Sequence, residues 1–347
     1  MVEKSNKNND FYDVVLGSRI SLVRNLQNYK FPNVMDSEEA NIIKDILKEK
    51  IYNIDNFNFI YKDTIDLDDI EAEKLVESYK ITRQLLVNKK KSGYFINDNQ
   101  DITIMINEQN HLKIQVLNDG YKLKEIYDIA LKIDNKLEEN ISYAFNYKYG
   151  YLTTTIKEIG TGLKVNVLVH LPALTLIGDV REYIDEYKRL GINIEPFYLE
   201  FENCIEDIYC ISNARTIGIS EENLLEKLEK AVYKIAAKER EIRSIIYEIK
   251  AELIEDRVFR ALGILKNARI MKNEEAVDYL ADVRLGVSLG MYDKLSLEEI
   301  TNFMISIQNN NIIYNYLDND EDIKHKDIIR AEIIRNRLDN LEIEKEE

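Results

Sequence analysis

Five polar residues between two apolar runs carry the side chains best suited to chemistry in this chain: Asn107-Glu108-Gln109-Asn110-His111. Glu108 brings a carboxylate, which can hold a cationic group or accept a proton. Gln109 is a carboxamide, nearly isosteric with a carboxylate but uncharged and unable to accept a proton near neutral pH. Gln109 therefore cannot act as a general base.

The flanking residues must position this cluster. Residues 102–106 and 112–117 are β-branched, partly alternating segments, which predict a hairpin with residues 107–111 as its connection. If the strand alternation runs on into the connection, Glu108 and Gln109 point to opposite faces of the sheet.

Other candidate residues have a structural interpretation beside the chemical one. Gly160-Thr-Gly162 could cradle a phosphate or form an ordinary turn, and only its flanking residues can decide. Taken singly, His111 and His170 are interpreted as structural histidines. Lys89-Lys-Lys91 is interpreted as a solvated helix end.

Composition and charge restrict the class of protein. The chain has 347 residues, enough for two domains, and its net charge of −16 argues against nucleic acid or an anionic membrane as the main partner. Cys204 and Cys210 are too few for a disulfide framework and lack zinc-site spacing, so we expect reduced thiols and no metal site. The polar start and the lack of a long apolar run predict a cytoplasmic protein without signal peptide or membrane span.

The order of predicted elements indicates an α+β domain followed by a helical domain. Asp36 with Glu39 forms a capping pair, which marks the start of the first helix. We expect helices at 37–51, 69–88 and 123–138, strands at 164–171, 192–200 and 207–212, and then helices at 220–250, 256–266, 274–284, 296–308 and 325–343. This predicts a flexible tail at 1–10, an α+β domain at 11–250 and a helical domain at 251–347, with the boundary between Ile249 and Arg257.

Several segments, in a consistent order from about residue 12 to residue 338, resemble the bacterial protein arginine kinases (McsB-type), relatives of the creatine and arginine phosphagen kinases. The segments that carry the resemblance are Val15–Asn25, Asn107–His111, Tyr151–Thr153, Gly160–Leu163, His170–Leu174, Ile211–Asn213, Asp256–Arg260, Asp282–Gly286 and Lys326–Ala331. The resemblance implies an antiparallel sheet flanked by helices, followed by a helical domain for dimerisation and substrate docking. It also implies transfer of the ATP γ-phosphoryl group, with Mg²⁺, to a guanidinium nitrogen.

In such a reaction, cationic donors hold the phosphates, and a carboxylate orients and deprotonates the guanidinium. Gln109 replaces the family's catalytic Glu and Asn110 its Asp, which leaves Glu108 as the candidate substitute base. The nucleotide-binding positions implied by the resemblance are Arg19, which keeps an arginine, Ser21, Lys113 and Lys164, which replace arginines, and Gly160, Thr161 and Gly162. Thr155–Glu158 stands where the family has a Cys-Pro loop, and Lys90 where it has an adenine-side His.

These substitutions favour a pseudokinase. Lysine keeps its charge but not the planar fork with which arginine grips phosphate oxygens. Our first hypothesis is a binding or scaffolding protein in protein quality control. By resemblance its partners would be phosphoarginine-bearing proteins, an activator or active paralogue, or a Clp-type unfoldase, and it would form a homodimer or higher oligomer. The alternative is an active ATP-dependent protein-arginine phosphotransferase in which Lys113 and Lys164 hold phosphate. A metabolic phosphagen kinase is a third choice.

The C-terminal motif Lys326-Asp327-Ile-Ile-Arg330-Ala331 is similar to the family's phosphoarginine-binding pocket. Its charged residues are close together across the first turn of a predicted helix. A cation beside a carboxylate suits a ligand that carries a phosphoryl group and a guanidinium. The other interpretation is an i,i+3 surface pair between Asp327 and Arg330, and the sequence leaves both open.

Overall fold

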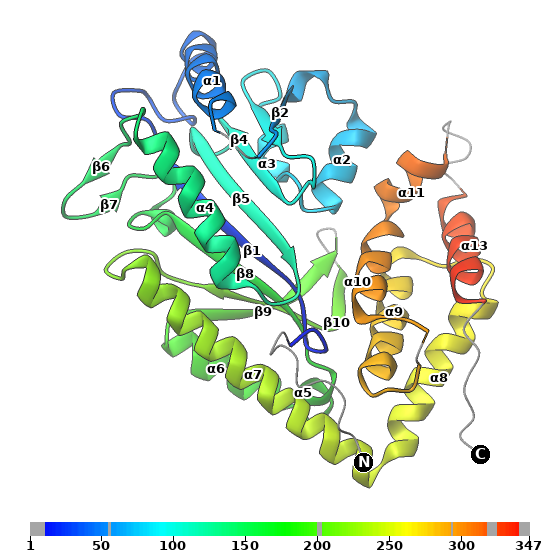
Figure 1. Ribbon diagram of the computed structural model, residues 1–347. Helices are drawn as coiled ribbons and strands as arrows, with labels where there is room; N and C mark the ends of the chain where they lie inside the picture. Colours follow the sequence, from blue (N-terminus) through cyan, green and yellow to red (C-terminus); the bar gives the residue numbers. More distant parts are fainter. Residues whose placement is uncertain (1–10, 55–56, 200–202, 293, 318–324, 340–347) are drawn as a thin grey trace.

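The computed structural model describes residues 11–54, 57–199, 203–292, 294–317 and 325–339. Its centre is an eight-stranded sheet in the order β2-β3-β4-β5-β1-β8-β10-β9, and every neighbouring pair is antiparallel (Figure 1). The predicted antiparallel sheet is confirmed. The strands are β1 Val15–Arg24, β2 Ile60–Asp63, β3 Gly93–Ile96, β4 Ile102–Ile106, β5 Leu112–Asp119, β8 Leu163–His170, β9 Ile192–Leu199 and β10 Asn203–Asn213. A separate small hairpin joins β6 Phe145–Asn146 to β7 Gly150–Tyr151.

One face of the sheet is apolar, because every second residue of its strands is aliphatic. Ile20 and Leu22 of β1, Ile114 of β5 and Val165 of β8 share this face with the main core. Three long helices contribute apolar stripes to this core: α1 Ser37–Tyr52, α4 Leu123–Glu138 and α7 Glu221–Ile249. Two shorter helices, α5 Pro172–Ile177 and α6 Val180–Arg189, complete the covering near β9 and β10.

The opposite face is largely polar and is covered only in part. Helices α2 Asp69–Glu77 and α3 Arg83–Val87 pack there against Tyr94 of β3 and Met105 of β4, in a small separate core. The segment between these two helices reaches the middle of the sheet, where Gln115 Nε2 of β5 donates to the carbonyl of Tyr79 at 2.7 Å. The rest of the polar face holds the residues discussed below.

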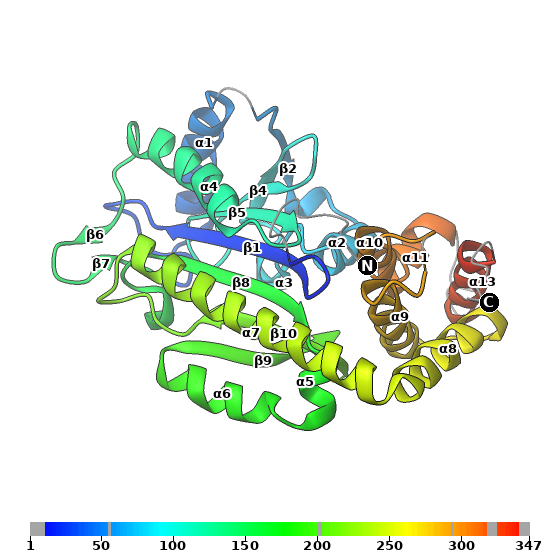
Figure 2. The same cartoon turned by 60° about the horizontal axis from the view of Figure 1, so that its bottom comes forward.

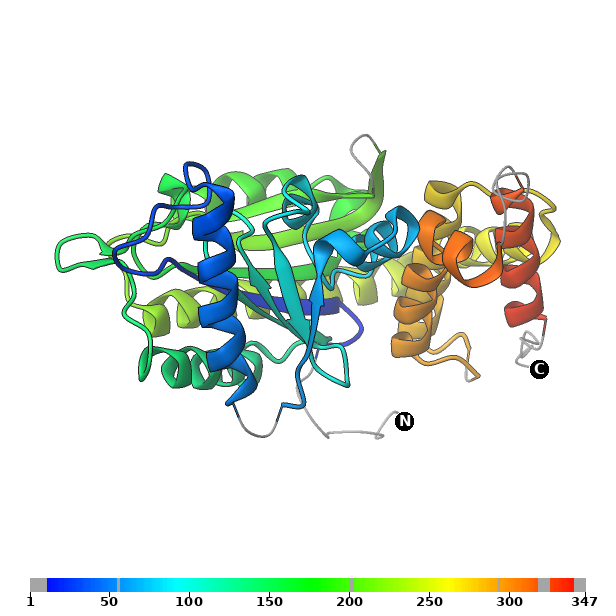
Figure 3. The ribbon, with the colours of Figure 1, turned by 90° about the horizontal axis from the view of Figure 1, so that it is seen from above.

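The last part of the chain is helical and lies at one end of the molecule, as the view from above shows (Figure 3). Its helices are α8 Ala251–Asn267, α9 Asn273–Ser288, α10 Leu297–Ser306, α11 Asn309–Tyr316 and α13 Lys326–Leu338. They enclose a second core, to which Leu16, Ile205 and Ile208 of the sheet contribute. Lys250 separates α7 from α8, where the chain changes direction (Figure 2).

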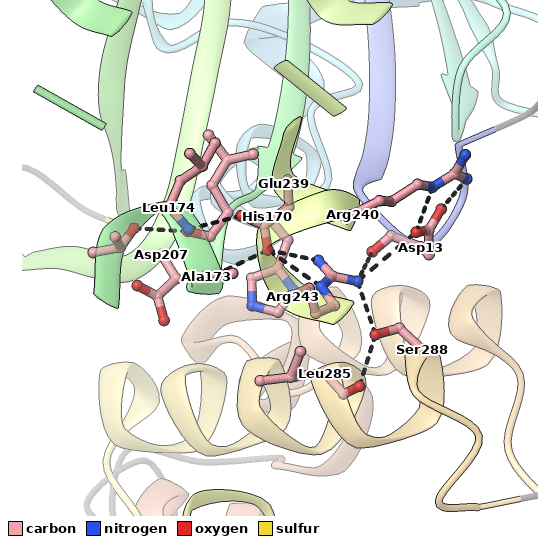
Figure 4. A network of polar contacts seen from close by, with 12 residues as sticks. Asp13, His170, Ala173, Leu174, Asp207, Glu239, Arg240, Arg243, Leu285 and Ser288 are labelled. Atoms are coloured by element: carbon pink, nitrogen blue, oxygen red, sulfur yellow. Dashed lines mark hydrogen bonds and ion pairs between the residues drawn. The ribbon is translucent and has the colours of Figure 1, made fainter. Parts of the chain in front are cut away.

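A buried polar network joins the two regions (Figure 4). Glu239 of α7 accepts the backbone N–H groups of Ala173 and Leu174 and pairs with Arg243 at 3.0 Å. Arg243 also donates to Ser288 of α9 at 2.9 Å. Because Glu239 and Arg243 are buried, each depends on its partner, and the network fixes α7 against both the sheet and the helical region.

Most predicted elements are confirmed, including the hairpin β4–β5, the helices α1 and α4, and the Asp36 cap, whose side chain accepts the Glu39 N–H. The prediction of a single helix at 69–88 was wrong, because α2 ends at Glu77 and a second helix, α3, begins at Arg83. Tyr79 adopts φ 57°, and the N–H of Lys80 bonds back to the carbonyl of Leu75, which closes the helix. The strand predicted at 207–212 begins earlier, at Asn203. The helices α5, α6 and α11 and the strands β2, β3, β6 and β7 have no counterpart among the predicted elements. The predicted tail at 1–10 lies outside the described residues.

Candidate active site

The polar face brings together the cations predicted to hold phosphate. Ser21 of β1 lies between Gln115 of β5 and Lys164 of β8, and Arg19 lies one pair further along. Lys113 stands opposite Val23 on the same face. Side chains two residues apart on a strand share a face, so the register places Arg19, Ser21, Lys113 and Lys164 on one surface.

The turn 107–111 is held by side-chain hydrogen bonds from all sides. Asn107 adopts φ 56° and donates through Nδ2 to the carbonyls of Ala40 and Lys91. His111 accepts the Leu26 N–H at Nδ1, and burial lowers its pKa to about 4. His111 is therefore a neutral structural residue, as its sequence interpretation proposed.

Asn110 is also part of this scaffold. It is fully buried, its Oδ1 accepts from Asn25 Nδ2 and the Thr154 N–H at 2.9 Å each, and its Nδ2 donates to Glu158 at 3.1 Å. A carboxamide suits this place because it must donate on one side and accept on the other. Asn110 thereby connects the turn to the segment 153–158.

Glu108 is the one carboxylate of the turn, and it already has partners. It is 4% exposed and accepts from Thr82 Oγ1 at 2.5 Å, Lys113 Nζ at 3.0 Å and the Gln109 N–H at 2.7 Å. Burial alone would raise the pKa of Glu108, but Lys113 and these hydrogen bonds outweigh it and hold the pKa below its usual value. Glu108 is therefore ionised and paired.

The expectation that Glu108 and Gln109 point to opposite faces of the sheet loses its basis. It rested on strand alternation, but residues 107–111 form a turn, so the alternation stops at Ile106. The carboxylate instead reaches back to Lys113 on the polar face. Gln109 is partly exposed, and its side chain forms no hydrogen bond with the part of the chain that the structure describes.

The other two predicted phosphate cations differ in their surroundings. Lys164 Nζ donates to the Asn213 carbonyl at 2.7 Å and to Ser212 Oγ at 3.3 Å, and burial lowers its pKa. Arg19 forms no ion pair within the described residues. The partly buried ring of Tyr79 lies near Arg19 and contacts Phe197, with ring centroids 6.2 Å apart.

The glycine loop is packed against the chain itself. The Gly160 N–H donates to the Tyr151 carbonyl and the Thr161 N–H to the Thr216 carbonyl. Gly160 has φ 117°, and a Cβ there would lie 2.2 Å from the Thr216 oxygen. Gly162 supports the same packing, since its carbonyl accepts the Val23 N–H. These two amide donors are thus engaged within the protein, as expected of a structural turn.

The C-terminal motif lies in the helical region, away from the polar face (Figures 1 and 3). Arg330 is 0% exposed and donates to the carbonyls of Ile307 and Met271 at 2.8 Å each, to Asn309 at 2.6 Å and to Asp327 at 2.5 Å. These contacts give Arg330 a structural role. Lys326 and Asp327, both partly exposed, remain candidates for a ligand.

Two further motif segments contact one another. Arg257 of α8 pairs with Asp282 of α9 and with Asp207 of β10, at 2.6 Å each. The sequence resemblance identified the two helical segments, Asp256–Arg260 and Asp282–Gly286, but not their partner Asp207. Thr82 was also missed, because a threonine before a helix reads only as a cap, yet here its hydroxyl donates to Glu108.

The antiparallel sheet flanked by helices is the fold that this chain shares with solved phosphagen kinases. A family model of the ATP:guanido phosphotransferase C-terminal catalytic domain matches residues 38–242, and one of the protein-arginine kinase McsB C-terminal domain matches residues 251–347. The chain belongs to the protein-arginine kinase family. No helix among the described residues has the length and apolar character needed to span a membrane.

Individual relatives agree with this assignment. A protein-arginine kinase of Caldanaerobacter subterraneus subsp. tengcongensis is 36% identical over 95% of this chain and 98% of its own length. A protein-arginine kinase of Clostridium tetani is 32% identical over 95% of this chain and 97% of its own length. The substrate-free duplicated taurocyamine kinase of Schistosoma mansoni matches with a TM-score of 0.59 and 20% identity, over 68% of this chain and 35% of that one, and shares the fold.

Proposed function

We propose that this chain is a pseudokinase of the protein-arginine kinase family that acts by binding. The observation that carries the proposal is the state of the turn 107–111. Gln109, at the place of the family's base, is uncharged, and the neighbouring carboxylate of Glu108 is held by Lys113 and Thr82. The contact between Glu108 and Lys113 thus engages both the candidate substitute base and one of the cations predicted to hold phosphate.

Magnitudes support a large loss of turnover. A missing general base costs about 10²–10⁴ in rate and a lost donor to the transferring group about 10²–10³. These factors do not multiply simply, since residues of one site act as a unit. Arg19 and Lys164 still offer positive charge to the phosphates of ATP and its Mg²⁺, so we propose weak nucleotide binding without efficient transfer.

The binding role would lie in protein quality control. By family resemblance, the proposed partners are phosphoarginine-bearing proteins, an activator or active paralogue, and a Clp-type unfoldase, with the chain itself in a homodimer or higher oligomer. The partly exposed Lys326 and Asp327 support a ligand site in the helical region. The net charge of −16 is also compatible with protein partners rather than nucleic acid.

The alternative, an active protein-arginine phosphotransferase, is favoured by one observation. Glu108 is ionised and lies beside Gln109, at the end of the polar face where the guanidinium would sit. However, a carboxylate whose pKa is held low is a weak base.

One experiment separates the two functions. The full chain is incubated with Mg-ATP and a generic arginine-containing protein, and phosphoarginine is measured, with Glu108→Gln as the matched variant. The pseudokinase proposal expects no signal above background from either protein. Robust phosphoarginine formation by the wild type that Glu108→Gln removes would establish the active enzyme instead.

A further inference from the structure

A cavity of about 400 Å³ lies at the end of the sheet, between the β6–β7 hairpin and the first turn of α7. Tyr149 and Tyr151 line it from the hairpin, and Glu221 and Glu222 from the helix. Figures 1 and 2 both show the hairpin beside the N-terminal end of α7, at the opposite end of the molecule from the helical region. The cavity shares Gly160 and Thr161 with the glycine loop, but Arg19, Lys113 and Lys164 of the polar face do not line it, and neither does the C-terminal motif.

The floor of the cavity is closely packed backbone. A Cβ on Gly150 would lie 2.5 Å from the Gly160 oxygen, and one on Gly160 would lie 2.2 Å from the Thr216 oxygen. Both glycines have positive φ, 81° and 117°. The hairpin is thus packed closely against Gly160, and Gly160 against Thr216 in the loop after β10, which supports a preformed cavity.

The same elements already hold one guanidinium on their inner side. Arg24 stacks on the Tyr151 ring, with its central carbon 3.6 Å from the ring centroid. Its Nη2 lies 2.6 Å from Asp134 and 3.6 Å from Glu221. An aromatic face combined with carboxylates is the environment in which a planar cation is most stable, because the guanidinium stacks and pairs at once.

Negative charge exceeds positive charge around this cavity. Asp134, Glu221 and Glu222 supply three carboxylates. Arg24 is the buried cation, and Asp134 Oδ1 is buried without a partner among the described residues. Glu222 is exposed and forms no ion pair with any described cation, while Lys148 Nζ lies 5.2 Å from the Tyr149 ring at the rim. The outer half of the cavity therefore offers an aromatic ring and a carboxylate to a second cation.

Exposed apolar side chains lie on the hairpin and at the cavity. Phe145 is 52% exposed and Tyr147 102%, with their ring centroids 5.9 Å apart, and Ile217, which lines the cavity, is 50% exposed. Clustered exposed apolar residues around a polar cavity mark a binding surface. A ligand that fits both features has a cationic group flanked by apolar groups.

We propose that this cavity binds the side chain of an unmodified arginine in an extended segment of another protein, with the flanking apolar residues of that segment on the β6–β7 hairpin. The guanidinium stacks on Tyr149 and pairs with Glu222. The site recognises arginine without any nucleotide, so it is independent of whether the polar face turns over ATP.

The test measures binding of a labelled, end-capped peptide with one arginine between two leucines to the full chain, without nucleotide. A peptide with citrulline in place of arginine keeps the shape and removes the charge. The arginine peptide should bind saturably, and the citrulline peptide roughly three- to tenfold more weakly, the range of one cation–π contact with a partly exposed ion pair. Equal binding of the two peptides would overturn the proposal.

Variants locate the site. Glu222→Gln and Tyr149→Leu should each weaken arginine binding, whereas Lys148→Ala should strengthen it, because Lys148 competes for the same ring. Glu226→Gln, on the same helix but paired with Lys230, is the matched control and should bind as the wild type. A general loss of folding cannot give effects of opposite sign. Wild-type affinity in both Glu222→Gln and Tyr149→Leu would place the peptide elsewhere and refute the assignment.

Discussion

Glu77, the last residue of α2, accepts the backbone N–H of Asn310 at the start of α11, at 2.9 Å. It also accepts the backbone N–H and the side-chain amide of Asn311, at 2.9 and 3.1 Å. A carboxylate at a helix N-terminus satisfies unpaired donors and favours the helix dipole. Because Tyr79 follows two residues later and lies near Arg19, this cap connects the helical region to the polar face.

Glu77→Ala should destabilise the protein by about 1–3 kcal/mol, because it leaves buried amide donors of α11 unsatisfied. Glu77→Gln keeps one acceptor oxygen and should cost less. Urea denaturation gives the free energies, and hydrogen exchange should show earlier opening of α11. The control is Glu73→Ala. Glu73 lies on the same helix as Glu77, and its carboxylate forms a partly exposed ion pair with Arg83. Equal stability of Glu77→Ala and the control would contradict the role of the cap.

Restoring the family's carboxylate by Gln109→Glu should not restore phosphoryl transfer. The new carboxylate would lie beside Glu108, while Ser21 would still stand in place of the family's arginine and Lys113 would still be paired. Phosphoarginine formation from Mg-ATP is the measurement. Turnover regained by this single change would show that the losses on the polar face matter little.

Mg-ATP should bind the wild type weakly, with a dissociation constant above the low micromolar range, and Glu108→Gln should tighten it roughly three- to tenfold. The substitution removes a negative charge near the phosphates and releases Lys113, whose ammonium is 3.0 Å from Glu108. Calorimetry measures both proteins. Adding Lys113→Met to Glu108→Gln should remove the part of the gain that Lys113 supplies, and an affinity unchanged by this second substitution would mean that Lys113 does not hold phosphate.

Stability should fall as pH rises from about 4 to 6, because of two carboxyl groups at the junction of α9 and β10. Burial raises the pKa of Asp278 and of Asp282 to about 6 each. In this window the folded protein binds more protons than the unfolded chain, so raising the pH favours unfolding.

Asp278→Asn keeps the oxygen that accepts the Glu206 N–H and removes the charge. The variant should match the wild type near pH 4 and exceed its stability by of order 1 kcal/mol at pH 7.5. Urea denaturation at both pH values is the measurement. A constant difference between the proteins across this range would exclude the titration of Asp278 as the cause.

The sequence predicted the fold well where local signals agree with tertiary packing. The β4–β5 hairpin and α4 have clear periodicity, and their bounds match the structure closely. The break after Glu77 was not predictable, because its left-handed residue is Tyr79 rather than the usual glycine. The motif residues Arg19, Ser21, Lys113 and Lys164 do lie together on the polar face, as the register shows. The hydrogen-bond partners of the motif residues could not be predicted from the sequence, because Thr82 and Glu108, for example, are 26 residues apart and come into contact only in the folded chain.

In the C-terminal motif, Asp327 holds the buried Arg330, so Asp327→Ala would disturb both a ligand and the helix packing. Arg330→Ala should destabilise the protein by about 3 kcal/mol or more, since it removes a buried cation and leaves two carbonyls without their donor. Lys326 is partly exposed and is the cleaner probe of the ligand.

If the motif binds phosphoarginine, Lys326→Ala should weaken binding of a phosphoarginine peptide at least several-fold, because a phosphoryl group loses its cation. Its thermal stability should stay within about 0.5 kcal/mol of the wild type, as for other surface substitutions. Lys272→Ala, a cation in the same region that precedes α9, is the control and should leave binding unchanged. Undetectable binding by the wild type at millimolar peptide would leave Asp327 and Arg330 as a helix-stabilising pair and nothing more.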